Sequence, residues 1–179
     1  MIIFFDLGDT LVRQSSTSSY ELIPGALQAL QEIHSMKDAD NNLPIMGLII
    51  DAHRMEEAPL SETEKEQKKS WILDILKKTN IKQLFDPIET YVTLSSDIGF
   101  TKSQNFKGFI DIALNKVNKN NEYEITVFIT EDKEHISLAK SIGIKTIQIT
   151  NKNNSDLLDD EINALSQLSI KIKKFIDDE

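Results

Sequence analysis

The sequence predicts an α/β fold with a central parallel sheet and helices on both faces, and three observations support this. Short apolar runs rich in β-forming residues recur along the 179 residues, and longer amphipathic stretches separate them. The runs are apolar throughout rather than alternating, which is typical of strands covered on both faces. Alternation of strand and helix predicts a three-layer, Rossmann-like arrangement.

Five strands are expected, and a short edge strand is expected near Ile162. Their ranges are 2–5, 45–50, 91–94, 125–129 and 146–149. Apolar positions at helical spacing predict helices between them and at the end of the chain. These helices are expected at 26–33, from Ser61 through the stripe Trp71, Ile72, Ile75 and Leu76, at 106–117, at 135–142 and at 165–175. Ser61 and Glu64 have the spacing of a capping box, and the apolar stripes are expected in the core.

Composition limits the class of protein. A chain of this length with 40% hydrophobic residues is expected to form one domain, residues 1–179, without stabilising disulfides. The absence of cysteine excludes disulfides, thiolate zinc sites and a cysteine nucleophile, and it suits the cytoplasm. A formal net charge of -9 opposes nucleic-acid binding. No apolar run approaches the ~20 residues that span a bilayer, so no membrane partner is expected.

The chemistry is expected where the first predicted strand ends. Asp6 directly follows the apolar residues 2–5, and Leu7, Gly8, Asp9 and Thr10 come next. Ligands of open parallel sheets usually bind beyond the carboxyl ends of the strands. Asp6 is therefore placed as a candidate catalytic residue.

Residues 4–11 resemble the first motif of the haloacid dehalogenase-like (HAD) superfamily, in which an apolar strand is followed by Asp-x-Asp-x-Thr. The resemblance implies that Asp6 is a nucleophile forming an aspartyl-phosphate, that Asp9 and Thr10 bind phosphate, and that Mg2+ balances charge. The second aspartate of the motif, a general acid and base, is replaced here by Gly8. A magnesium contact through the backbone carbonyl of Gly8 needs no side chain.

Three later segments follow the order of the family's motifs. The second motif usually ends in Ser or Thr, but Ile50 or Asp51 stands there, and neither provides a hydroxyl donor. The third segment, residues 95–102, leads to Lys102, which resembles the family's lysine at a helix start and would balance the charge of Asp6 and the phosphoryl group. An exposed lysine at a helix start is the alternative interpretation.

The fourth segment follows the strand expected at 125–129. Glu131 and Asp132 stand where the family has magnesium ligands, and His135 stands where a later acid is expected. The metal set implied by the resemblance is thus Asp6, Gly8 through its carbonyl, and Glu131 or Asp132. The alternative is an acidic helix start that the helix dipole favours, with His135 on the helix surface or behind the reacting groups.

The family's cap domains have no room here. Only about a dozen residues separate Leu11 from the helix that opens at Pro24, so no large cap domain is expected. An open site makes a macromolecular phosphorylated substrate, such as a phosphoprotein, plausible. Residues 13–20, rich in Ser and Thr, are interpreted as a short flap or as a surface loop.

Three functions follow from the resemblance. The first is a magnesium-dependent phosphatase with Asp6 and Lys102 as catalytic residues, slowed by the replacement at Gly8. The second is a catalytically inactive binding or regulatory protein on the same fold. Displacement at carbon, as in the dehalogenases, is the third, and it is disfavoured because no cap encloses the substrate. A receiver-like phospho-acceptor domain would need an acid in the third strand, residues 91–94, which has none.

Overall fold

The computed structural model describes residues 1–16, 19–38, 40–52, 60–150 and 156–177. Its main feature is a six-stranded sheet in the order β5-β4-β1-β6-β7-β8, with every pair of neighbours parallel. The strands are β1 (Ile2–Phe5), β4 (Ile45–Ile50), β5 (Val92–Leu94), β6 (Thr126–Thr130), β7 (Lys145–Ile149) and β8 (Glu161–Ile162). The predicted parallel sheet is confirmed, including the edge strand that contains Ile162.

Strand β1 lies in the middle of the sheet and is buried on both faces. Ile3 and Phe5 point into one apolar cluster, whereas Ile2 and Phe4 point into the other. This alternation follows from the strand's two-residue period, because successive side chains point to opposite faces. All four residues are apolar, so neither face of β1 could stand in water.

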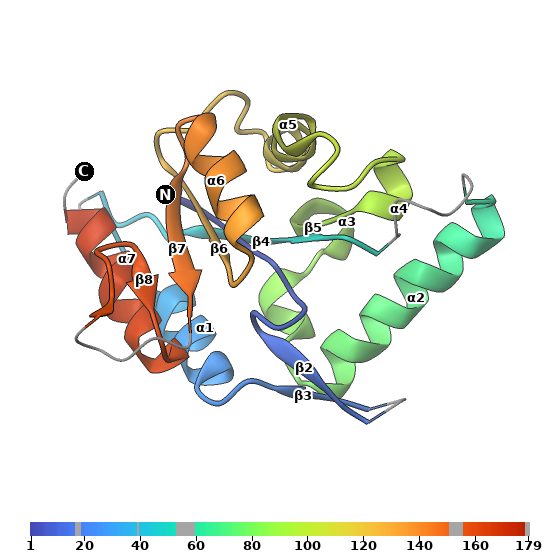
Figure 1. The fold of residues 1–179 in the computed structure, drawn as a ribbon, viewed down its shortest axis with the longest axis horizontal. Coiled ribbons are helices and arrows are strands. Elements are labelled where there is room, and N and C mark those ends of the chain that lie inside the picture. The colour runs from blue at the N-terminus through green and yellow to red at the C-terminus, as the bar shows by residue number, and fades with distance from the viewer. Residues whose placement is uncertain (17–18, 39, 53–59, 151–155, 178–179) are drawn as a thin grey trace.

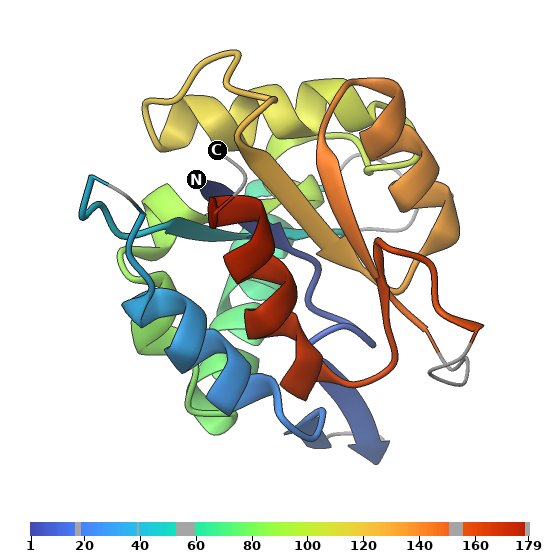
Figure 2. The same ribbon diagram turned by 90° about the vertical axis from the view of Figure 1, so that its left-hand side faces the viewer.

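Helices cover both faces of the sheet. The larger cluster is closed by α1 (Ala26–Ser35), α2 (Glu62–Lys78) and α7 (Leu168–Asp177), and the smaller cluster by α5 (Phe106–Lys116) and α6 (Lys133–Ser141). The two views show α5 and α6 on one side of the strands and α1 and α7 on the other (Figures 1 and 2). The predicted three-layer architecture is therefore confirmed.

Shorter elements connect these layers. They are η1 (Lys82–Phe85), α3 (Ile88–Tyr91), α4 (Ser95–Ile98) and η3 (Leu165–Gln167). A separate antiparallel hairpin, β2 (Val12–Ser16) and β3 (Ser19–Leu22), occupies the segment interpreted as a flap or loop. The described residues contain no large cap domain, and none of their helices is long and apolar enough to cross a membrane.

Helix α2 shows how local sequence sets an element. The side chain of Ser61 accepts a hydrogen bond from the backbone N–H of Glu64, and the Glu64 side chain accepts one from the backbone N–H of Ser61, so the predicted capping box is present. Ile72, Ile75 and Leu76 are buried as expected. The prediction that Trp71 lies in the core is wrong, because 44% of its surface is exposed. One helical position away from the buried stripe, Trp71 packs instead on Tyr20 of β3.

The order in which the chain forms the strands reverses at one point of the sheet. From β1 the chain passes to β4 and β5 on one side, and then returns to β6, β7 and β8 on the other. The carboxyl ends of β1 and β6 therefore flank the position at which the order reverses. In open parallel sheets this switch point is where ligands bind.

Candidate active site

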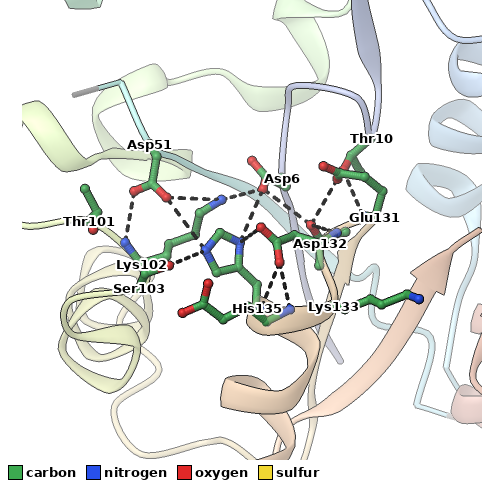
Figure 3. A network of polar contacts seen from close by, with 12 residues as sticks. Asp6, Thr10, Asp51, Thr101, Lys102, Ser103, Glu131, Asp132, Lys133 and His135 are labelled. Atoms are coloured by element: carbon green, nitrogen blue, oxygen red, sulfur yellow. Dashed lines mark hydrogen bonds and ion pairs between the residues drawn. The ribbon is translucent and has the colours of Figure 1, made fainter. Parts of the chain in front are cut away.

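Asp6 and Lys102 form an ion pair at the carboxyl end of β1. The Lys102 Nζ atom donates to Asp6 Oδ2 at 2.5 Å and to the carbonyl oxygen of Ile49 at 3.3 Å. The other oxygen of Asp6 accepts from the backbone N–H of Leu7. Only 1% of the Lys102 side chain is exposed, so the alternative of a surface lysine is wrong. Figure 3 shows the two side chains reaching each other from separate segments.

The backbone turn that holds Lys102 is tied to the end of β4. Lys102 lies three residues before Asn105, the N-cap of α5, rather than at the helix start that its motif predicts. Its backbone N–H donates to Asp51 Oδ1 at 2.9 Å, and Asp51 Oδ2 lies 3.9 Å from Lys102 Nζ. Asp51 thus orients the lysine through both the backbone and the charge. The sequence marked Asp51 only as a departure from the hydroxyl of the second motif.

Burial raises the pKa of the Asp51 carboxyl, and the positive charge of Lys102 only partly offsets this. The charge of Asp6 adds to the rise. A carboxyl with a raised pKa carries a proton over a wider pH range, and a protonated carboxyl can donate a hydrogen bond. In that form Asp51 can perform the donor role of the missing hydroxyl.

Thr10 and Thr130 hold Glu131 beside Asp6. The hydroxyl of Thr10 donates to Glu131 Oε2 at 2.8 Å, and the hydroxyl of Thr130 lies 3.3 Å from the same oxygen and 3.4 Å from Asp6 Oδ2. Burial raises the pKa of Glu131, and the nearby charge of Asp6 adds to this effect. A cation bound beside Glu131 would offset this cost of ionising its carboxyl.

The oxygen donors here fit a magnesium ion held by few protein groups. Magnesium commonly uses one or two carboxylates and completes its shell with water and substrate phosphate. Asp6 and Glu131 would be such a pair, with the carbonyl of Gly8 nearby in the chain. Asp132 caps α6 instead, since its carboxylate accepts from the backbone N–H groups of Glu134 and His135. Within the described ranges no three acidic or histidine side chains cluster around one metal position.

His135 is buried in the site rather than placed on the helix surface. Its Nδ1 atom lies 3.9 Å from Asp6 Oδ2 and 3.6 Å from Asp132 Oδ2, while Nε2 lies 3.9 Å from Asp51 Oδ2. The hydroxyl of Ser103 is 3.3 Å from Nε2. Nδ1 has no hydrogen-bond partner among the described residues. The imidazole therefore sits among three carboxylates, as the close view shows (Figure 3).

A cavity of about 270 Å³ opens in front of Asp6. Gly8 and Asp9 lie on its lining, whereas Thr10 is fully buried behind it. Asp9 adopts a left-handed backbone conformation, φ 52°, and its N–H donates to the carbonyl oxygen of Val12. Of the residues proposed from sequence, Asp6, Gly8, Asp9 and Lys102 thus share one cavity. Glu131 contacts Thr10 from the adjoining side.

The sequence matches no family model and no curated protein. The fold is nevertheless similar to solved structures. A HAD-superfamily hydrolase from Ehrlichia chaffeensis has a TM-score of 0.64 at 13% identity, with 97% of this chain and 96% of that chain covered. A putative beta-phosphoglucomutase from Thermotoga maritima gives 0.59 at 13% identity, with 97% and 98% covered.

A dehalogenase solved with an intermediate complex gives a TM-score of 0.60 at 15% identity. The match covers 84% of this chain but only 56% of the dehalogenase's length. Fold and site together define an α/β protein with a lysine-paired aspartate at the carboxyl edge of its sheet. The chain has the haloacid dehalogenase-like fold, as its motifs predicted. The structural similarity establishes the fold, but at such low identities the activity has to be argued from the site itself.

Proposed function

We propose that the chain is a magnesium-dependent phosphohydrolase that acts through an aspartyl-phosphate at Asp6. The observation that carries this proposal is the buried ion pair between Asp6 and Lys102 at the mouth of the cavity. A lysine ammonium held against a carboxylate orients that carboxylate, and it balances the charge of an incoming phosphoryl group. A surface ion pair would have neither consequence.

The reaction has two displacements. An oxygen of Asp6 forms a bond to phosphorus while the bond from phosphorus to the ester oxygen breaks, and the leaving group takes the electron pair. Water then attacks phosphorus, the bond to Asp6 breaks, and phosphate leaves with one proton released to solvent. Asp6 and Glu131 would hold Mg2+, which supplies charge neutralisation for the transferring group. Lys102 holds Asp6 in place through both steps.

The test compares wild type with Asp6→Asn in the presence and absence of Mg2+. We expect magnesium-dependent release of phosphate from an activated aryl phosphate by wild type, and loss of that release in Asp6→Asn. The matched control is Asp177→Asn, which makes the same chemical change at an exposed residue of α7 that does not line the cavity. Unchanged turnover in Asp6→Asn would remove Asp6 from the mechanism.

A second candidate is a binding or regulatory protein without useful catalysis. Two observations favour it: Gly8 has no side chain to transfer a proton, and a carboxylate at Asp51 replaces the hydroxyl of the second motif. Magnesium and phosphate binding by wild type, measured by calorimetry, with no hydrolysis of any phosphoester, is the result this candidate expects. Efficient turnover by the pure protein would exclude it.

A further inference from the structure

The cavity in front of Asp6 has two unlike walls. One wall is charged and polar, and consists of Asp6, Asp51, Lys102 and His135. The other wall is apolar and comes from three places: the β2–β3 hairpin, the end of β4 and one face of α2. Its residues are Val12, Tyr20, Ile50, Trp71, Ile72 and Ile75. A ligand that contacts both walls needs an anionic group and an apolar part.

Two aromatic rings stand at the apolar wall. The rings of Tyr20 and Trp71 have centroids 5.7 Å apart and meet edge to face at 75°. Trp71 is the only tryptophan of the chain, and nearly half of its surface is exposed beside the buried Ile72 and Ile75. A flat ring in the cavity would contact the part of Trp71 that lines it and gain a further aromatic contact. The hairpin and α2 lie side by side in Figure 1.

The lack of a side chain at Gly8 limits which leaving groups can depart. Gly8 provides no acid to protonate the ester oxygen as it departs. A phenol ionises near pH ~10, as tyrosine does, whereas water ionises about six pH units higher and alkyl alcohols resemble water. An aryl oxygen can therefore leave as the anion without assistance, and an alkyl oxygen leaves poorly without it. The missing side chain and the aromatic wall point to the same kind of ester.

We propose that the substrate is a phosphate monoester of a phenol, with its ring against Tyr20 and Trp71 and its phosphoryl group in front of the ion pair of Asp6 and Lys102. The proposal rests on the phosphohydrolase function given above. The cavity volume of about 270 Å³ is enough for one phosphoryl group and one ring. Asp6 displaces the phenolate, which takes the electron pair of the broken bond and a proton from water, and water then releases phosphate from Asp6.

The first test compares phenyl phosphate with glycerol 2-phosphate in steady-state assays of wild type. We expect kcat/KM to be at least about tenfold higher for phenyl phosphate. Trp71→Ala is expected to raise KM for phenyl phosphate by about tenfold and to leave KM for glycerol 2-phosphate unchanged. Ile170→Ala is the matched control, because Ile170 is exposed on α7 and does not line the cavity.

The outcomes separate the aryl-ester proposal from the phosphohydrolase proposal on which it rests. Equal kcat/KM for the two esters, or an equal effect of Trp71→Ala on both, would overturn the aryl assignment and leave the hydrolase standing. No hydrolysis of any phosphoester would overturn the hydrolase. Binding then decides the assignment, with Trp71 fluorescence as the readout: tighter binding of phenyl phosphate than of inorganic phosphate to Asp6→Asn supports it, and equal binding overturns it.

Phosphotyrosine in proteins carries the same aryl ester as a small phenyl phosphate. A phosphotyrosine peptide therefore forms a second arm of the assay. Higher kcat/KM for the peptide assigns a macromolecular source of the ring, and higher kcat/KM for phenyl phosphate assigns a small one. Both results support an aryl ester at the wall of Tyr20 and Trp71.

Discussion

Restoring a carboxyl at Gly8 tests the reaction most directly. A Cβ atom built at Gly8 would have no heavy atom within 4 Å, and the backbone there is outside the left-handed region. Gly99 and Gly143 also have open space, but both have positive φ, so a side chain there would be strained. Gly8→Asp should therefore fold with a free energy of unfolding within about 0.5 kcal/mol of wild type.

The expected gain comes from general acid and base assistance. A positioned proton-transfer group typically accelerates a reaction about 10²–10⁴-fold, which is about 2.7–5.5 kcal/mol of barrier. Glycerol 2-phosphate should receive most of this gain, because its alkoxide leaves poorly without a proton. Phenyl phosphate should receive less, because phenolate leaves without one. The preference of wild type for the aryl ester should accordingly shrink in Gly8→Asp.

The assay is steady-state phosphate release from both esters at saturating Mg2+. Gly8→Asn is the matched control, since an amide has the size of the carboxyl but cannot transfer a proton. If Gly8→Asp is no faster than wild type on the alkyl ester while it still folds and binds phosphate, the absent acid is not what limits this site. The same conclusion follows if Gly8→Asn accelerates the reaction equally.

Three further changes probe other parts of the molecule. Asp51 is ionised above its raised pKa and then repels phosphate, so Asp51→Asn should bind inorganic phosphate on the order of tenfold more tightly than wild type at neutral pH. Calorimetry across pH should show this difference in affinity vanish under acid conditions. A constant difference at all pH values would contradict the prediction. Because the pKa of Glu131 is raised on folding, protonated Glu131 stabilises the fold below its unfolded pKa, and this contribution is lost as pH rises through the folded pKa. Glu131→Gln should therefore have a higher Tm than wild type at neutral pH without Mg2+, and it should lack the increase in Tm that Mg2+ gives wild type. An equal increase in Tm for both proteins would remove Glu131 from the metal site. Phe109 of α5 is fully buried, and Phe109→Ala should cost about 3–5 kcal/mol of unfolding free energy in urea titrations, whereas a loss below about 1 kcal/mol would contradict the packing.

The fold was predictable because two of its strands, β1 and β4, are continuous apolar runs. Residues 2–5 and 45–50 have no polar interruption, so both faces of each strand had to be covered, and helices supply that cover. The hairpin of β2 and β3 was not predicted as strands. Its residues are mostly exposed, and pairing across a turn leaves little signal in such a segment.

The candidate site was predictable only in part. Motif order placed Asp6 and Lys102 together, and the two side chains do meet. Asp51 and His135 also belong to this group. Asp51 contacts the backbone of Lys102, 51 positions away in the sequence, and His135 contacts Ser103, 32 positions away. Contacts over such distances depend on how the strand ends line up, which no local pattern encodes. The position of His135 in the first turn of a helix after β6 was the one available signal.

The position of β1 has a consequence for how the chain is made. Asp6 is synthesised 96 positions before its partner Lys102, and β6 follows later still. At ~5–20 residues per second, a central strand of four buried apolar residues waits about 5–20 s before Lys102 is even synthesised. Chaperone demand during translation should therefore be set by this strand, and slowing translation between β4 and β6 should increase aggregation more than slowing it after β7.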